Sequence, residues 1–155
     1  MRKLFATAND PTMTVLRLAL GAVFFTHGAQ KALGWFGGPG YSATMGMFTQ
    51  RMGFPGWLAI LAIAAEFLGG LGLILGFLAR IAAFGLFVDM LVALFKVHLH
   101  NGFFMNWTGQ KHAEGFEFHI LALAGLLAIL AHGAGAVSVD RAIAGGRKTA
   151  AAGRR

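Results

Sequence analysis

Apolar residues dominate the chain in four long runs, each interrupted by only a few polar side chains. The runs cover residues 12–34, 57–77, 79–99 and 115–135. A helix needs about 20 mostly apolar residues to cross a bilayer, and each run reaches that length. None of the runs shows the alternation of apolar and polar positions that is typical of a membrane β-strand. The pattern therefore predicts an all-α protein, a four-helix transmembrane bundle with up-down-up-down topology.

Composition supports a membrane protein over a soluble bundle. Hydrophobic residues make up 57% of the 155 residues and charged residues only 12%, whereas soluble domains are about one quarter charged. The helices of a soluble bundle would carry polar faces, which these runs lack. The end of the first run and the residues after it, AQKALGWFGG (29–38), offer no clean cleavage pattern, so we interpret the run as a span and not as a signal peptide. The chain has no cysteine, which excludes disulfides and thiolate metal ligands.

The distribution of basic residues predicts the orientation in a bacterial inner membrane. Lysine and arginine concentrate on the cytoplasmic side of membrane proteins. With four spans, both termini and the second connection share a side, and the larger basic set lies there: Arg2, Lys3, Arg80, Arg141, Arg147, Lys148, Arg154 and Arg155. The other side carries Lys31, Arg51, Lys96 and Lys111. We therefore expect a membrane-embedded domain over residues 1–140 and a flexible basic cytoplasmic tail over residues 141–155.

The connections differ in length, which predicts where the chain is compact. Almost no residues separate the second and third runs, so a tight hairpin is expected between Leu75 and Ile81. The outer connections, residues 36–56 and 100–114, are longer and rich in glycine and aromatic residues. Tryptophan and tyrosine near the outer ends of the runs are typical of a membrane interface.

Glu66 is the acid that stands out, because it lies near the middle of the second run with apolar residues on both sides. Ionisable groups within a membrane are costly and face the bundle interior, paired with one another. We expect Glu66 to face inward and either to be protonated or to pair with a cation, with Lys31, His27 or Lys96 as the candidate partners. Glycines beside it, at positions 69, 70 and 72, would let a neighbouring helix approach closely. His27 and Lys31 share a helix face, with Gly21 and Gly28 nearby.

Further polar residues are predicted to gather in the outer half of the bundle. The candidate polar or ligand site consists of Glu66, His27, Lys31, Lys96, His98, Glu117 and His119. Asp89 lies near the middle of the third run and shares a helical face with Lys96, whereas Arg80 and His98 share the opposite face. Glu117 and His119 are two residues apart and point to different sides. The alternative for the lysines and for His98 is that they extend to the lipid headgroups.

Four segments, in order and with their spacing, resemble the DoxX family of small bacterial membrane proteins. They are RLALGAVFFTHGAQKALG (17–34), AEFLGGLGLILGFLAR (65–80), KVHLHNGFF (96–104) and GFEFHILALAGLLAILAHGAGAVSVDR (115–141). The family is similar to the membrane part of an archaeal thiosulfate:quinone oxidoreductase, and other members resemble parts of bacterial redox-stress complexes. The resemblance implies a four-helix membrane bundle and an association with oxidoreductases and quinone.

Three functions remain open. In the first, the chain is a membrane subunit of a redox complex that binds quinone. If it is enzymatic, it belongs to a quinone-reducing oxidoreductase. Paired histidine and carboxylate groups suit the proton uptake of quinone reduction. In the second, it is a structural or assembly subunit whose buried polar residues only fix helix register. In the third, it is a small transporter or handles metal or haem, although no close histidine spacing supports a metal site and none is expected.

Partners would be the bilayer, redox proteins or a second copy of the chain. Nucleic acid is not expected, because the basic residues form no folded module.

Overall fold

The computed structural model describes residues 4–109 and 113–152. Within these residues the chain is helical and contains no strand, as the sequence predicts. Several residues of the charge comparison lie outside the described residues: Arg2, Lys3, Lys111, Arg154 and Arg155.

Helix α1 (Pro11–Leu33) corresponds to the first apolar run, and local sequence signals set both of its ends. The side chain of Asp10 accepts a hydrogen bond from the Thr12 backbone amide at 2.8 Å, and Pro11 occupies the first helical position. The helix ends at Gly34, whose φ of +73° lies in the left-handed region that favours glycine. This end begins the outer connection, which contains η1 (Trp35–Gly37), α2 (Gly40–Gly46) and the π-helical turn η2 (Met47–Arg51).

The second and third runs form two long helices, and each contains a π-helical turn. The first consists of α3 (Gly56–Ala64), the π turn η3 (Ala65–Gly69) and α4 (Gly70–Leu75). The second consists of α5 (Ala79–Ala93), the π turn η4 (Leu94–His98) and the short 3-10 turn η5 (Leu99–Asn101). Only residues 76–78 separate α4 from α5, so the predicted tight hairpin is confirmed.

The last two helices differ from the predicted boundaries. Helix α6 (Glu117–His132) is shorter than the run 115–135, because Gly133 and Gly135 have φ values of +85° and +84° and end the helix. Helix α7 (Val139–Ala152) occupies most of the segment that we expected to be a flexible tail. Its alanine-rich sequence explains the difference, since alanine has the highest helix propensity.

Within the described residues, three helical stretches are long and apolar enough to cross a membrane: Pro11–Leu33, Gly56–Leu75 and Ala79–Asn101. Helix α6 is apolar but has only 16 residues. Many large apolar side chains lie on the outside of these helices, for example Val15, Leu68 and Leu121, with exposed fractions of 67%, 60% and 73%. Such a surface is typical of helices that face lipid.

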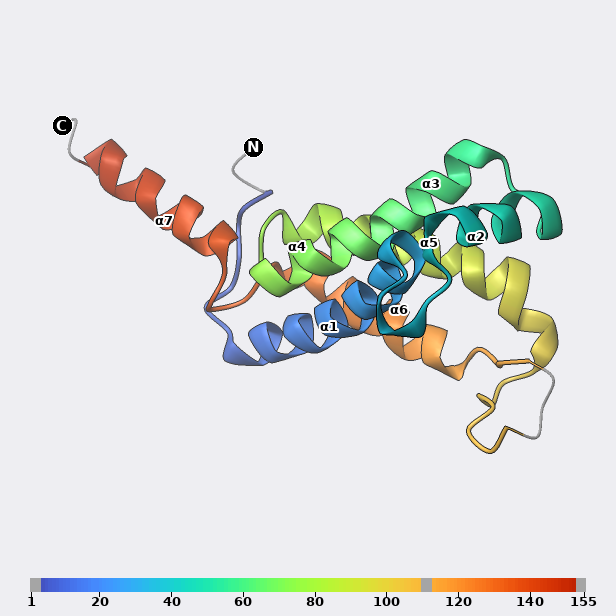
Figure 1. Cartoon of the computed structure of the whole chain (residues 1–155). Coiled ribbons are helices and arrows are strands. Elements are labelled where there is room, and N and C mark those ends of the chain that lie inside the picture. The colour runs from blue at the N-terminus through green and yellow to red at the C-terminus, as the bar shows by residue number, and fades with distance from the viewer. Residues whose placement is uncertain (1–3, 110–112, 153–155) are drawn as a thin grey trace.

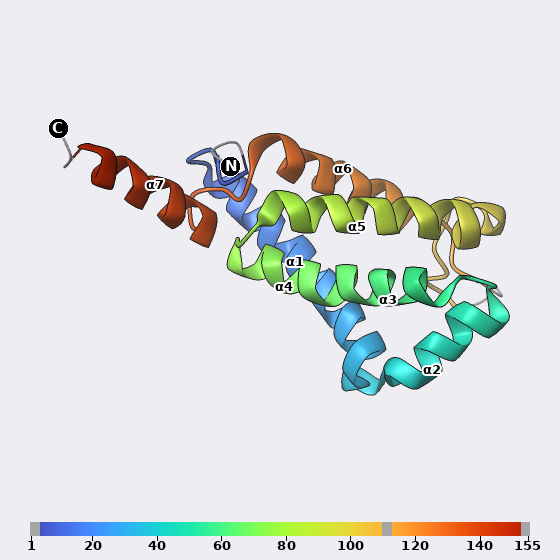
Figure 2. The ribbon, with the colours of Figure 1, turned by 90° about the horizontal axis from the view of Figure 1, so that it is seen from above.

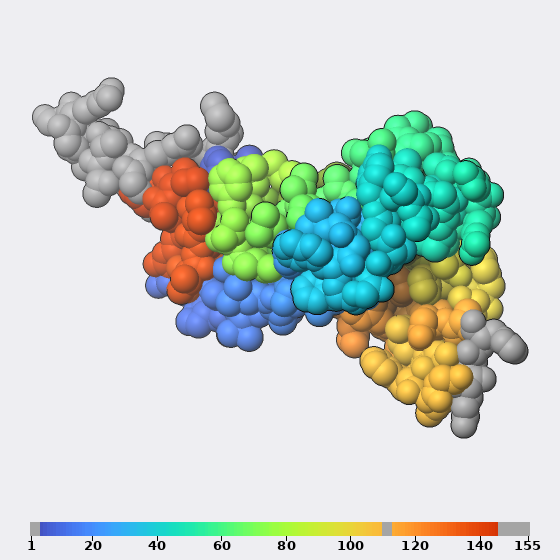
Figure 3. All heavy atoms as spheres, in the orientation of Figure 1, coloured from blue at the N-terminus to red at the C-terminus, as the bar shows by residue number. Residues whose placement is uncertain are grey.

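The helices pack as a bundle with its loops gathered at two ends. Helices α5 and α6 run side by side, α3 and α4 lie along α5, and α1 crosses them at an angle (Figures 1 and 2). The N-terminal segment and the start of α7 lie at one end, and α2 and the 100–109 segment lie at the other (Figure 3). The core is apolar and includes Phe24, Leu73, Leu86, Leu126 and Ile129.

Two arginines hold the end of the bundle that carries α7. Arg17 is 1% exposed and donates hydrogen bonds to carbonyl oxygens at the end of α4 and after α6. Its acceptors are Leu73, Ile74, Ala134 and Val137. Arg80 donates in the same way to Leu130 and Ala131 at the end of α6. Both side chains donate to carbonyl groups at helix ends and in the loop after α6, so we interpret these arginines as structural.

Candidate functional site

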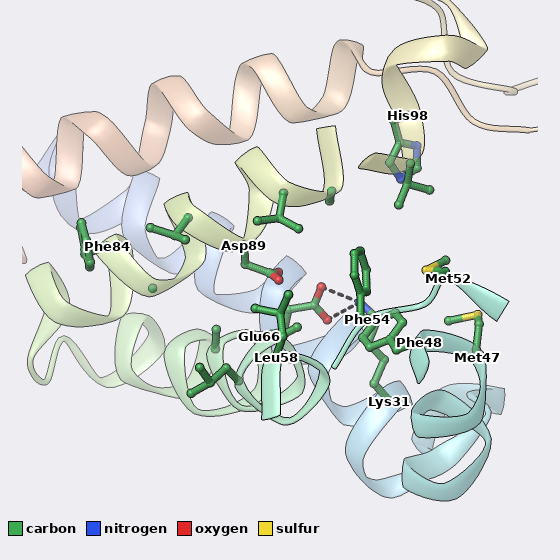
Figure 4. A pocket seen from close by; sticks show the side chains of 18 residues that line it. Lys31, Met47, Phe48, Met52, Phe54, Leu58, Glu66, Phe84, Asp89 and His98 are labelled. Atoms are coloured by element: carbon green, nitrogen blue, oxygen red, sulfur yellow. Dashed lines mark hydrogen bonds and ion pairs between the residues drawn. The ribbon is translucent and has the colours of Figure 1, made fainter. Parts of the chain in front are cut away.

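Glu66 lies in the π turn η3, faces the interior and pairs with a cation from α1. Its exposed fraction is 5%. The Lys31 ammonium group donates hydrogen bonds to both carboxylate oxygens of Glu66 (Figure 4). The expectation that Glu66 faces inward beside one of three cations is therefore confirmed, and Lys31 is the partner. The Lys31 side chain keeps 24% of its surface exposed, so the pair lies at the boundary of a hollow and not in a closed core.

A glycine contact brings the two halves of this ion pair together. At Gly28, one turn before Lys31, a Cβ atom would lie 2.3 Å from the Phe67 backbone nitrogen and 2.6 Å from the Glu66 carbonyl carbon. At Gly70 a Cβ atom would lie 2.3 Å from the Phe25 backbone nitrogen. The backbones of α1 and the second span therefore touch directly, as the glycines predict. This contact places Lys31 beside the π turn.

Asp89 on α5 completes a group of three charged side chains. Its side chain points toward the Glu66 carboxyl group from the opposite helix (Figure 4). Two neighbouring carboxyl groups repel each other when both are ionised, so a proton on one of them stabilises the arrangement. Asp89 is absent from the site predicted from the sequence, although an acid in the middle of an apolar run is the same signal that singled out Glu66.

These side chains line a cavity of about 440 Å³ between α3, α5 and the outer connection. The remaining wall is apolar apart from His98, and aromatic and methionine side chains of the outer connection cover one side, among them Met47, Phe48 and Phe54 (Figure 4). Pockets for small ligands have this composition, with a few polar groups in a mainly apolar wall.

All three π turns of the described residues contribute to the cavity. Met47 and Phe48 come from η2, Glu66 from η3, and His98 from η4. A π turn holds one more residue than an α turn, and such turns occur frequently at functional sites. Their gathering around one hollow marks it as the candidate functional site of the molecule.

The structure brings together only part of the predicted set. Lys31, Glu66 and His98 line the cavity, whereas His27 and Lys96 are exposed and lie outside it. Asp89 and Lys96 would share a face in a regular α-helix, but they line different hollows. The π turn η4 explains this correction, because its extra residue rotates the following side chains by roughly one helical step, about 100°.

The other two predicted residues, Glu117 and His119, lie on α6 outside the cavity. Glu117 accepts hydrogen bonds from the Met105 amide at 3.0 Å and the Trp107 indole at 2.9 Å, so it orders the outer connection. His119 is buried, and its ring lies 4.2 Å from that of His98 between centroids. As predicted, the two residues point to different sides.

The hydrogen bond of His98 fixes its tautomer. Nδ1 lies 3.0 Å from the backbone carbonyl oxygen of Glu114, and a carbonyl can only accept. We infer that Nδ1 carries the hydrogen, so that Nε2 of the neutral ring is an acceptor. His98 can therefore take up a proton at Nε2 at the edge of the cavity.

Comparison with known proteins identifies the family to which this site belongs. Residues 12–99 match the DoxX family. The chain belongs to the DoxX family. Its cavity lies wholly within the matched region, since every lining residue falls between Lys31 and His98. The site is thus part of the DoxX domain, and α6 and α7 lie beyond the matched residues.

Two relatives extend the similarity over most of the chain. The chain is 31% identical over 133 residues to the inner membrane protein YqjF of Escherichia coli K12, covering 86% of this chain and 92% of that protein. It is 30% identical over 148 residues to the uncharacterized membrane protein Rv3486 of Mycobacterium tuberculosis, covering 90% and 85% respectively. No solved structure matches the chain significantly. Together with the apolar helices, these relatives show a bacterial membrane protein.

Proposed function

We propose that the protein is a membrane subunit of a redox complex and binds a quinone in the cavity lined by Lys31, Glu66, Asp89 and His98. The observation that carries this proposal is a charged group of one ammonium and two carboxyls on the wall of an otherwise apolar hollow, inside a membrane protein. Ionisable groups in such a position indicate a substrate or proton site by default. The redox association suggested by the DoxX resemblance supports the same conclusion.

The donor groups of the cavity fit the two ends of a quinone. An ammonium group has three N–H donors, and the ion pair with Glu66 uses two of them. The third can donate to a quinone carbonyl oxygen. The flat ring would pack against apolar side chains such as Phe48, Phe54 and Leu58, which also exclude water.

The carboxyl pair suits the proton balance of quinone reduction. A quinone becomes a quinol by taking up two electrons and two protons, one proton on each oxygen. The electrons would come from a redox partner protein. A proton held by the neighbouring Glu66 and Asp89 carboxyl groups would go to one quinone oxygen, and His98, after it takes up a proton at Nε2, would supply the second.

We also propose that this site lies in the outer half of the membrane. In the proposed topology α6 crosses as a fourth span, antiparallel to α5, and both ends of the chain lie in the cytoplasm. Sixteen helical residues rise by about 24 Å, slightly less than the roughly 30 Å hydrocarbon core, and local thinning accommodates the difference. The excess of basic residues near the two ends of the chain supports this orientation.

Quinone binding can be measured directly on the purified protein. Decylubiquinone is titrated into the protein in lipid nanodiscs, and the heat of binding is recorded. Lys31→Gln should weaken binding by about tenfold, which corresponds to about 1.4 kcal/mol. His27→Ala is the matched control, because His27 lies one turn away on α1 but is exposed outside the cavity. Its affinity should stay within about twofold of the parent.

The same titration separates this function from a structural role. If the parent binds no quinone, or if Lys31→Gln binds as tightly as the parent, the proposal fails. An assembly subunit without chemistry, whose ion pair only fixes helix register, would then be the better explanation.

A further inference from the structure

A second hollow adjoins the cavity on the outside of the bundle. It measures about 800 Å³ and lies between the start of α3, the end of η2 and the outer part of α5 with η4. We call it the lateral groove. Its wall is mainly apolar, and Phe95, which lines the groove and not the cavity, is 58% exposed. Its two cations, Arg51 and Lys96, are both exposed.

The cavity and the lateral groove share one wall. Met52, Phe54, Leu58, Val92 and Val97 line both of them. All five side chains are apolar, so the boundary between the two hollows contains no charged side chain. A hydrocarbon chain could pass from one to the other without burying a charge unpaired.

The groove opens where a membrane protein meets lipid. It lies on the two helical stretches Gly56–Leu75 and Ala79–Asn101, both of which are long and apolar enough to cross a bilayer. The charged groups Lys31, Glu66 and Asp89 all belong to the cavity, and none of them lines the groove. The groove is apolar apart from the exposed Arg51 and Lys96, whereas the ion pair and Asp89 lie in the adjoining cavity.

We propose that the lateral groove holds the alkyl or isoprenoid tail of a ligand whose polar head binds in the cavity. The ligand is then a lipid-borne, tail-bearing quinone that enters sideways from the bilayer. This inference rests on the proposed function and specifies its substrate class. The apolar shared wall and the lipid-facing mouth of the groove together select a long hydrocarbon tail over a water-soluble molecule.

The absence of cysteine from the chain permits a selective test. Phe95→Cys places a single thiol in the groove, outside the cavity, and a bulky maleimide is attached to it. Binding of two probes is then measured in nanodiscs: decylubiquinone, and the same quinone head without a tail. The label should weaken binding of decylubiquinone by about tenfold. Binding of the tail-free quinone should change by less than about twofold, because the cavity is untouched.

The matched control is Leu121→Cys carrying the same label, since Leu121 lies on α6 and is 73% exposed. This variant should bind both probes like the parent. If the label at position 95 changes the affinity of both probes by the same factor relative to the parent, the groove proposal is wrong.

Lys31→Gln distinguishes failure of this inference from failure of the proposed function. It should weaken both probes, because it acts on the head. If Lys31→Gln weakens both probes while the label at position 95 does not weaken decylubiquinone more than the tail-free quinone, only the groove proposal is wrong. If Lys31→Gln changes neither probe, or if the parent binds neither, the quinone site itself is wrong and the groove proposal falls with it.

Discussion

The ion pair between Lys31 and Glu66 is the residue-scale feature from which the site is built. Glu66 is almost fully buried, and three-quarters of the Lys31 side-chain surface is buried. Breaking a buried pair by removing one partner leaves an uncompensated charge, whereas replacing both partners by apolar groups of similar size can be neutral. The pair therefore constrains which substitutions the protein tolerates.

Glu66→Leu should lower the free energy of unfolding by about 3 kcal/mol, because Lys31 loses its counter-charge inside the bundle. This value lies at the lower end of the range expected for removing one partner of a buried ion pair, because the Lys31 side chain is partly exposed. Glu66→Gln should keep most of the stability, because the amide preserves shape and hydrogen bonding. Unfolding in detergent with increasing denaturant measures both changes.

The double variant Lys31→Met with Glu66→Leu is the control for this interpretation. It removes both charges and should recover the stability to within about 1 kcal/mol of the parent. If the double variant is as unstable as Glu66→Leu alone, packing and not charge explains the loss.

At the scale of elements, direct backbone contact between α1 and the second span sets the position of the site. Gly28 and Gly70 allow this contact from the two sides. At the opposite end, the first turn of α7 secures the start of α5. The Asp140 carboxylate accepts hydrogen bonds from the backbone amides of Leu78 at 2.8 Å and Ala79 at 2.9 Å. Amides at a helix start have no partner within the helix, so a carboxylate stabilises them.

Gly28→Ala should destabilise the fold by about 1–3 kcal/mol, because its new Cβ atom would collide with the backbone at Phe67 and force the helices apart. Gly46→Ala is the matched control: it lies in helix α2, and nothing lies within 4 Å of the added Cβ. That substitution should be neutral or slightly stabilising. Equal unfolding midpoints for the two variants would contradict the close contact.

Asp140→Ala should lower the free energy of unfolding by about 2 kcal/mol and increase cleavage by trypsin after Arg141, since the start of α7 loses its hold on the α4–α5 hairpin. Asp10→Ala removes a cap of the same kind from α1, but its single hydrogen bond is exposed and local. The control should lose about 1 kcal/mol or less and leave the cleavage rate unchanged. A larger effect at Asp10 than at Asp140 would show that the long-range cap is unimportant.

At the scale of the whole molecule, the two structural arginines lie at one end of the bundle and the cavity lies at the other. Arg17 and Arg80 satisfy helix ends near α7, while Lys31, His98 and the outer connection surround the cavity. The first end is rigidly hydrogen-bonded, and the second is covered by flexible methionine and aromatic side chains. This division suits a protein that holds its fold at one membrane face and binds a ligand near the other.

Fusion reporters test the proposed orientation. Alkaline phosphatase, which is active only outside the cytoplasm, should be inactive when fused after residue 155 and active when fused within residues 100–114. The physical basis is the excess of lysine and arginine near the chain ends, which disfavours their translocation. The reverse activity pattern would overturn both the orientation and the placement of the cavity in the outer half.

Much of the fold was determined by the sequence alone, because a bilayer imposes strong local requirements. Long apolar runs must be helices in lipid, so the helical class, the approximate helix bounds and the tight hairpin follow from the pattern. The inward position of Glu66 follows in the same way, since a carboxylate facing lipid would be too costly. The contact glycines were also visible, because small residues mark close helix packing.

Tertiary structure decided which polar residues meet. Regular helical periodicity could not foresee the π turns, which rotate Lys96 away from the cavity and leave His98 at its edge. It could not show that Arg17 reaches carbonyl groups from two other segments, or that Asp140 caps a helix 61 residues earlier in the chain. The choice of Lys31 as partner for Glu66, while His27 lies exposed one turn away, depends on the crossing angle of α1. Such long-range contacts are set by how whole helices pack, and no local pattern of residues encodes that packing.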